Sequence, residues 1–265
     1  MRVTACLLPA AVAVVTTACA SYPLYPGKPE TLKLPSEAVG DTFLIEIFAP
    51  AGKSESLQAL YVLDGAINAD PVAAYVYEEK LPYLVVGVGY VQGFAPDKRR
   101  RDFLFEKDSF YSQPTGNGDA FQAFLTDELI PLIDEREEVD PERRWLLGHS
   151  LSGLFALHAA FEDDAEDPVF DVVMAASPAL FHAGGALLDV EAAFDAKHPL
   201  QLVVSYGDLE AAPIAGYTRE LVSRLKKRDD ENLSLRSTVV PNAVHDATWF
   251  PTFTEGIDWA GEAAP

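Results

Sequence analysis

A serine at position 150 stands where the sequence favours nucleophilic chemistry. The segment from Arg143 to Leu157 reads RRWLLGHSLSGLFAL, in which a short apolar run ends at Gly148-His149-Ser150 and apolar residues at helical spacing follow. This pattern predicts a strand, a tight turn and a helix, with Ser150 at the apex of the turn. Such a turn holds a hydroxyl clear of the backbone at the positive end of a helix, which suits attack on an electrophilic carbon.

The segment departs from the usual G-x-S-x-G pattern at one position. Ser152 stands where the second glycine is expected, and Gly153 comes one position later. A small residue is needed there because the helix passes close to neighbouring strands, and serine is still small. Ser152 is the weaker candidate nucleophile, because Ser150 rather than glycine lies two residues before it. A helix start that merely packs well is the alternative interpretation.

A serine hydroxyl needs a general base, and the chain contains five histidines. The last of them, His245, follows the predicted strand Leu233–Val240 and a short turn, where a base is expected. His182 follows Ser177-Pro178, and we expect it either to line a pocket or to occupy an ordinary loop. The other three are poorly placed, and the one inside the turn is expected to point away from the serine: His149, His158 and His198.

The acid that orients the base is expected between the serine and the histidine, in the loop after a strand. Leu200–Ser205 reads as that strand, and Gly207-Asp208-Leu209-Glu210 follows it. We favour Glu210, because Asp208 is so close to the strand end that it suits a loop cap. Asp208 is the alternative acid, and a solvated turn is the plain interpretation of both carboxylates.

Acyl transfer also needs hydrogen-bond donors for the charge that develops on the carbonyl oxygen. One donor is expected to be the backbone N–H of Leu151, directly after the nucleophile. The second is expected from Gly65, after the predicted strand Gln58–Leu63. Each such donor typically contributes a factor of ~10² to 10³ in rate. An ordinary Asp-Gly turn is the alternative interpretation of Gly65.

Composition restricts the class of protein. The chain has 265 residues, 49% of them hydrophobic, which suits one large α/β domain with a full core. Its 41 acidic and 20 basic residues give a formal net charge of −21. Nucleic acid is therefore a poor partner, since phosphate binding requires a basic face. No His, Cys and Asp cluster has metal-ligand spacing, so we expect neither a metal nor another cofactor.

Strands alternate with helices along the chain, which predicts a mostly parallel central sheet with helices on both faces. The predicted strands are Thr42–Phe48, Gln58–Leu63, Tyr83–Tyr90, the run at Trp145, Val172–Ala176, Leu200–Ser205 and Leu233–Val240. The predicted helices are Asp119–Glu138, one from Leu151, Gly185–Ala196, Ile214–Arg228 and Trp249–Trp259. In such folds functional residues gather beyond the carboxyl ends of the strands. No long insertion interrupts the core, so no large lid is expected.

The first residues read as an export signal. Val3–Val15 is apolar but too short for a membrane span, and Thr16-Thr17-Ala18-Cys19 resembles a bacterial lipoprotein processing site. We therefore predict a signal peptide over 1–20 with Cys19 lipidated, and a periplasmic protein that contacts the membrane only through this anchor. Ordinary secretion with cleavage after Ala20 is the alternative. The other cysteine, Cys6, lies in the same segment and is removed with it, so no disulfide is expected in the mature protein.

Four prolines between positions 21 and 35 predict a tether that leads into a single domain over 36–265. The sequence does not indicate an oligomeric state.

From about Leu57 to Trp249 the chain resembles the "Putative esterase" family of α/β hydrolases, particularly enterochelin (ferric siderophore) esterases. The resemblance rests on YVLDG at 61–65, VVGVGY at 85–90, RRRDF at 99–103, FLTDELIPLID at 124–134, GHSLSGLFAL at 148–157, AASPAL at 175–180 and HDATW at 245–249. The departures are Ser152, and the stretch 179–182 where siderophore esterases tend to be rich in serine and tryptophan.

The resemblance implies an α/β-hydrolase fold and a serine esterase without cofactor. It also implies Ser150 as nucleophile, His245 as base, Glu210 as acid, and Gly65 with Leu151 as oxyanion donors. The implied substrates are ferric siderophores or related polyphenolic esters. A short-acyl carboxylesterase or formylglutathione-hydrolase-like esterase is the nearest alternative, and a catalytically silent binding protein is another.

The densest cationic run of this acidic chain is Lys98-Arg99-Arg100-Arg101, which we expect in a loop after the VVGVGY strand. We expect part of it, at Arg99, Arg100 and Arg101, to face an anionic substrate, with His182 as a further pocket residue. The alternative is that these arginines pair with nearby Asp97, Asp102 and Glu106.

Overall fold

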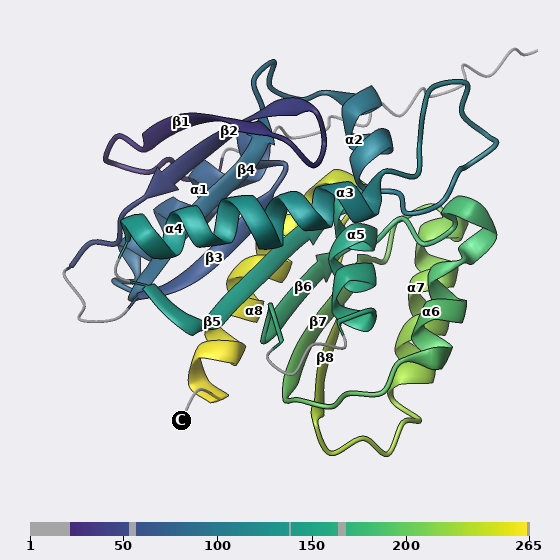
Figure 1. Cartoon of the computed structure of the whole chain (residues 1–265). Coiled ribbons are helices and arrows are strands. Elements are labelled where there is room, and N and C mark those ends of the chain that lie inside the picture. Colours follow the sequence, from purple (N-terminus) through teal and green to yellow (C-terminus); the bar gives the residue numbers. More distant parts are fainter. Residues whose placement is uncertain (1–21, 53–56, 138, 164–167, 264–265) are drawn as a thin grey trace, which may run out of the picture.

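The computed structural model describes residues 22–52, 57–137, 139–163 and 168–263, and the predicted signal peptide with Cys6 and Cys19 lies outside them. Eight strands in this part of the chain form one sheet in the order β1-β2-β4-β3-β5-β6-β7-β8 (Figure 1). The strands are β1 (Glu30–Ser36), β2 (Asp41–Phe48), β3 (Leu57–Leu63), β4 (Tyr83–Tyr90), β5 (Val139–His149), β6 (Val172–Ala176), β7 (Leu200–Gly207) and β8 (Leu233–Val240). Strands β4, β3, β5, β6, β7 and β8 are mutually parallel, β2 pairs antiparallel with β4, and β1 pairs antiparallel with β2. The predicted α/β architecture is confirmed.

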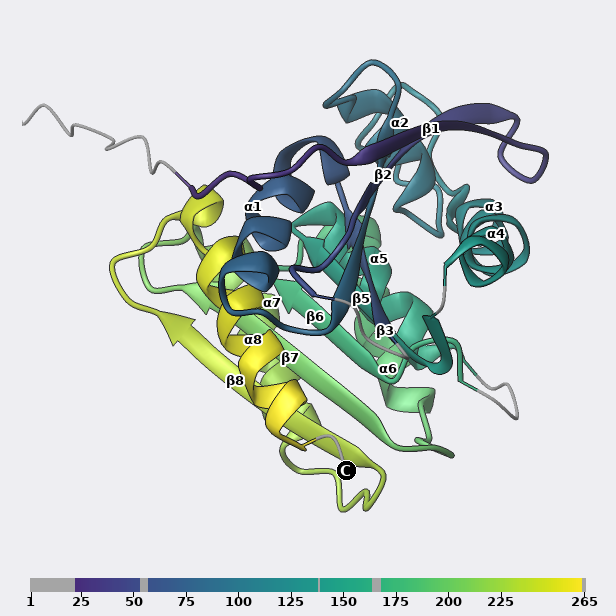
Figure 2. The same cartoon turned by 90° about the vertical axis from the view of Figure 1, so that its left-hand side faces the viewer.

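Helices cover both faces of this sheet (Figure 2). Helices α1 (Gly65–Glu78) and α8 (Trp249–Ala263) pack on one face around Val72, Phe253 and Ile257. The other face carries α2 (Pro96–Asp102), α3 (Gly118–Ala123), α4 (Ile130–Arg136), α5 (Leu151–Phe161), α6 (Leu187–Ala193) and α7 (Ala212–Leu225). The central strands are therefore buried on both sides, which is why β4 is apolar along its whole length.

The predicted tether over 21–35 is wrong in its second half. Residues Glu30–Ser36 form β1, which pairs antiparallel with β2 at the sheet edge. Pro35 is tolerated there because an edge strand can leave a missing N–H on its solvent side. The chain therefore joins the sheet one strand earlier than its proline content indicates.

Three helical features also differ from the expectations. The predicted helix Asp119–Glu138 is α3 followed by a π-helical turn (Phe124–Leu129) and then α4, which starts at Ile130-Pro131. The backbone stays helical across Leu129 and Ile130, so Pro131 lies inside a continuous helical run, where its missing N–H removes one hydrogen bond next to the π-helical turn. The run at 98–101, expected in a loop, lies in α2, and α1 was not predicted.

The parallel strands all end on the same side of the molecule, and the loops that follow their carboxyl ends carry the candidate residues. Ser150 follows β5, Glu210 follows β7 and His245 follows β8. Within the described part of the chain, no helix has the length and apolar character needed to cross a bilayer.

Candidate active site

Ser150 occupies the predicted tight turn between β5 and α5. Its backbone has φ 61° and ψ −116°, a conformation that costs roughly 1–3 kcal/mol and that the surrounding structure must enforce. Gly148 permits the turn, because a Cβ there would lie 2.2 Å from the Ser152 carbonyl oxygen. The sharp reversal leaves the Ser150 hydroxyl on a cavity wall rather than in the core.

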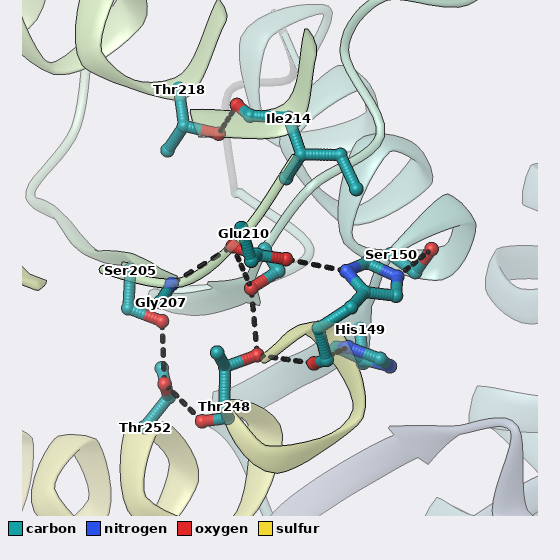
Figure 3. A network of polar contacts seen from close by, with 11 residues as sticks. His149, Ser150, Ser205, Gly207, Glu210, Ile214, Thr218, Thr248 and Thr252 are labelled. Carbon is teal, nitrogen blue, oxygen red and sulfur yellow. Dashed lines mark hydrogen bonds and ion pairs between the residues drawn. The ribbon is translucent and has the colours of Figure 1, made fainter. Parts of the chain in front are cut away.

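The imidazole of His245 lies between Ser150 and Glu210. Its Nε2 is 2.8 Å from Ser150 Oγ, and its Nδ1 is 2.5 Å from Glu210 Oε1 (Figure 3). A carboxylate only accepts hydrogen bonds, so Nδ1 carries a hydrogen and Nε2 of the neutral ring is free to accept the serine proton. Such an arrangement can move a proton away from Ser150 as its oxygen attacks a carbonyl carbon.

Of the two candidate acids, Glu210 is the one beside His245. Its side chain is fully buried, and Oε2 accepts hydrogen bonds from the Gly207 N–H at 2.8 Å and the Ser177 Oγ at 2.9 Å. Burial raises the pKa of Glu210, but the hydrogen bonds from His245, Gly207 and Ser177 outweigh it and leave the pKa below its ordinary value. Asp208 instead accepts a hydrogen bond from the Ala243 N–H at 3.2 Å, as a loop cap does.

The His245 backbone is held in place from two sides. Its carbonyl oxygen lies 3.0 Å from His149 Nε2 and accepts a hydrogen bond from Thr248 Oγ1 at 3.0 Å. Burial, reinforced by the neighbouring His245, lowers the pKa of His149 to about 4. His149 is therefore neutral at physiological pH and donates its Nε2–H to the carbonyl. Its ring was expected to point away, yet it lies 4.6 Å from the His245 ring and lines the same cavity.

Gly65 and Leu151 each begin a helix at this edge of the sheet, Gly65 in α1 and Leu151 in α5. Among the described residues, neither backbone N–H has an intramolecular acceptor, as is usual for the first residue of a helix. The sheet itself requires glycine at position 65. A Cβ there would lie 2.8 Å from the backbone of Gly87 and Val88 in β4.

The three arginines of α2 do not behave alike. Arg99 lines the Ser150 cavity, where its Nε and Nη2 donate to the two carboxylate oxygens of Asp64 at 2.6 and 2.9 Å. Arg100 pairs with Asp97, and Arg101 pairs with Asp102 and Asp41. The expectation that this run faces a substrate therefore applies to Arg99 alone. It is wrong for Arg100 and Arg101, whose guanidinium groups form ion pairs with carboxylates of α2 and β2.

His182 was expected as a substrate-binding residue, and the structure does not bring it to Ser150. Its Nδ1 lies 2.9 Å from Asp108 Oδ2, and its ring packs against Tyr111 and Phe181. It does not line the cavity that contains Ser150. The prediction fails because the loop after β6 turns toward α6 and buries the imidazole.

The cavity in front of Ser150 has a volume of about 550 Å³. This size lies within the usual range for small-molecule sites, about 300–1,000 Å³. Its walls combine the polar residues described above with apolar and aromatic side chains, namely Tyr22, Ile67, Phe94 and Trp249. The ring of Tyr22, the first described residue, packs 4.6 Å from that of Trp249, so the start of the described chain forms part of the wall.

Comparison with known proteins places this geometry in a family. The family described as "Putative esterase" matches residues 36–256. The chain belongs to this esterase family. It is therefore a carboxylic ester hydrolase with an α/β-hydrolase fold, and the resemblance stated from the sequence is confirmed.

Relatives of this esterase include proteins named for siderophore ester hydrolysis. It is 25% identical to the apo-salmochelin esterase of Escherichia coli over 229 residues, which is 77% of this chain and 70% of that one. It is 30% identical to the siderophore triacetylfusarinine C esterase of Aspergillus fumigatus over 58% of this chain and 54% of that one, about half of the relative's length.

Solved structures share the fold of this esterase. The BES protein of Bacillus cereus superposes with a TM-score of 0.80 at 24% identity, covering 91% of this chain and 97% of that one. The siderophore hydrolase EstA of Aspergillus nidulans gives a TM-score of 0.72 at 20% identity, covering 93% of this chain and 99% of that one.

Several residues of the site in this esterase were not singled out from the sequence. Ser177 Oγ donates to Glu210, Thr248 Oγ1 donates to the His245 carbonyl oxygen, and Asp64 accepts hydrogen bonds from Arg99 and Ser152. A hydroxyl or a carboxylate carries no signal for such a role until the fold shows its partner. Gly65 was singled out after a predicted strand, but Asp64 was seen only as part of a possible Asp-Gly turn.

Proposed function

We propose that the protein hydrolyses esters through a Ser150–His245–Glu210 relay. Ser150 Oγ attacks the ester carbonyl carbon while its proton passes to His245 Nε2. Glu210 holds the ring in the tautomer with hydrogen on Nδ1 and stabilises the imidazolium that forms. The N–H groups of Gly65 and Leu151 donate hydrogen bonds to the carbonyl oxygen as negative charge develops on it. His245 then protonates the departing alcohol, and water hydrolyses the acyl-enzyme.

One observation carries this proposal, namely the pair of short contacts that His245 makes with Ser150 and Glu210 in an open cavity. The test is labelling with a fluorophosphonate probe, followed by mass mapping of the adduct. We expect one adduct on Ser150 and none on Ser152. A chain that hydrolyses p-nitrophenyl acetate but is labelled elsewhere, or not at all, would contradict the proposed mechanism.

We propose ferric siderophores or related polyphenolic esters as substrates. The relatives named for siderophore hydrolysis support this class, and so do the cavity walls. Tyr22, Phe94 and Trp249 offer aromatic surfaces for catechol or phenol rings. Asp64 uses Nε and Nη2 of Arg99, which leaves Nη1 to donate to a phenolate or carboxylate oxygen.

The substrate class is tested by comparing kcat/KM for a ferric trilactone siderophore, a feruloyl ester and a short-chain p-nitrophenyl ester. We expect the order of preference to follow aromatic and anionic character. A clear preference for the short-chain ester would favour a general carboxylesterase instead. Tight binding of the siderophore without turnover of any ester would favour a silent binding protein.

We also propose that the protein is exported and anchored through Cys19. The proposal rests on the processing-site sequence at 16–19. Intact mass of the mature protein from a bacterial membrane fraction tests it. A diacylglyceryl modification at Cys19 is the expected result, and an unmodified chain that begins at Ser21 would indicate ordinary secretion.

A further inference from the structure

Ser152 and Asp64 form a buried hydrogen bond between two segments that are 88 positions apart. Ser152 Oγ lies 2.6 Å from Asp64 Oδ2, and the Ser152 side chain is fully buried. The His149 carbonyl oxygen lies 2.9 Å from the same hydroxyl. A hydroxyl has one hydrogen, and the carboxylate is both the charged and the closer acceptor, so Ser152 donates to Asp64.

The Ser152–Asp64 hydrogen bond lies next to the two proposed oxyanion donors. Asp64 directly precedes Gly65, and Ser152 directly follows Leu151. The bond thus joins the residues next to the two N–H groups proposed as oxyanion donors. It ties Asp64, the residue before α1, to the first turn of α5, beside the cavity that Asp64 and Ser150 line.

The hydroxyl is also fixed from its other side, by the His149 N–H at 3.0 Å. Ser152 therefore bridges the turn that carries the nucleophile to Asp64, the residue directly before α1. A glycine at this position, as in the usual G-x-S-x-G pattern, has no side chain and makes neither bond.

The acceptor in this bridge has a left-handed backbone. Asp64 has φ 56° and ψ 41°, a conformation that, apart from glycine, mainly asparagine and aspartate adopt. Its carboxylate is almost fully buried, so its charge must be compensated. Arg99 supplies that compensation through two hydrogen bonds, which fixes the direction in which Asp64 presents Oδ2 to Ser152.

We propose that Ser152 is a positioning residue, whose hydrogen bond to the Arg99-paired Asp64 sets the separation and direction of the Gly65 and Leu151 N–H groups. The inference rests on the proposed function of these two groups as oxyanion donors. Such donors act because they are already aimed at the charged oxygen before the reaction starts, so a small displacement weakens transition-state binding more than substrate binding. Ser152 does not touch the reacting atoms.

The test compares Ser152→Ala with a matched buried serine far from the site. Ser36 is 5% exposed, lies in β1 and accepts one hydrogen bond from the Val39 N–H, so Ser36→Ala also removes one buried hydroxyl. For each full-length variant we would measure kcat and KM for p-nitrophenyl acetate, the inhibition constant of phenylboronic acid, and Tm. The boronic acid forms a tetrahedral adduct with a serine oxygen and therefore reports the oxyanion donors.

We expect Ser152→Ala to lower kcat by roughly 10-fold to 100-fold, because misplaced catalytic groups typically cost up to about 10². KM should stay within about twofold, and boronic acid affinity should fall in parallel with kcat. Ser36→Ala should lower Tm without changing kcat. Ser152→Cys keeps a weaker donor in nearly the same volume, so its kcat should lie between the wild-type and alanine values.

Wild-type kcat and boronic acid affinity in Ser152→Ala would overturn the inference. If the alanine variant does not fold, a wild-type kcat in Ser152→Cys would overturn it instead. Failure of the proposed function looks different, since the wild-type protein would then show no hydrolysis that depends on Ser150. That result would remove this inference as well.

Discussion

His245 Nε2 lies 2.8 Å from Ser150 Oγ, although 95 positions and two intervening strands separate the residues. Ser150 follows β5 and His245 follows β8, and the strands between them place these ends roughly 14 Å apart at the usual spacing of about 4.8 Å per strand. The loop after β8 must therefore reach back across β7 and β6. The hydrogen bonds that the His245 carbonyl oxygen makes with His149 and Thr248 hold this loop close to Ser150.

Replacement of the two candidate acids should give very different results. Glu210→Gln should lower kcat by about 10²-fold to 10⁴-fold, because the amide no longer stabilises the imidazolium and can favour the wrong tautomer. Asp208→Asn should change kcat by less than about threefold, since Asp208 contacts the Ala243 N–H rather than His245. Steady-state kinetics with p-nitrophenyl acetate decide between them. Equal losses in the two variants would refute the assignment of Glu210.

Arg99 should contribute to the binding of anionic substrates, in addition to its ion pair with Asp64. Arg99→Gln leaves the Asp64 charge uncompensated, so we expect kcat to fall for every ester. In addition, KM for an anionic phenolic ester should rise by about 5-fold or more relative to a neutral analogue, because one charged donor is lost from the cavity. The same ratio of KM values, measured for Arg100→Gln, should match wild type. An unchanged ratio in Arg99→Gln would show that this arginine serves only Asp64.

His158 should make the protein less stable as the pH falls. Burial lowers its pKa to about 4, while the unfolded chain takes up this proton near pH 6.5. Between these values the unfolded state binds more protons, so the free energy of unfolding decreases with falling pH by up to about 1.4 kcal/mol per pH unit. The ring stacks on Phe105, and leucine can keep most of the apolar contact.

His158→Leu should therefore flatten the dependence of stability on pH between about 6.5 and 4. Urea unfolding at several pH values measures it, and wild-type protein provides the comparison. Some dependence should persist, because the pKa of His149 is also lowered to about 4 by burial. Parallel curves for the variant and wild type would disprove the contribution of His158.

Much of the sheet could be predicted because buried parallel strands are apolar along their length, as in Tyr83–Tyr90. Strand β1 was missed because its sequence is rich in polar residues and contains proline, and its place depends on pairing with β2. Helix α1 was missed because Pro71 lies inside it and its apolar residues form no clear stripe. Tertiary packing supplies what these local sequences lack.

The candidate site divides in the same way. Ser150, His245 and Glu210 could be proposed from residue type and chain order, because each follows a strand at the same edge of the sheet. The bridge from Ser152 to Asp64 could not, because it joins residues 88 positions apart through side chains with no distinctive pattern. The ion pairs of Arg100 with Asp97 and of Arg101 with Asp41 could not be predicted with certainty either, because they depend on which carboxylates lie nearby in the fold.

The central claim is that one hydroxyl, that of Ser150, performs the attack on the ester. The most direct test is the kcat of Ser150→Ala with p-nitrophenyl acetate, using protein whose fold is verified by an unchanged circular dichroism spectrum. The account predicts a loss of roughly 10⁴-fold or more, with only oxyanion and binding contributions left. A variant that keeps more than about a tenth of the wild-type kcat would contradict it.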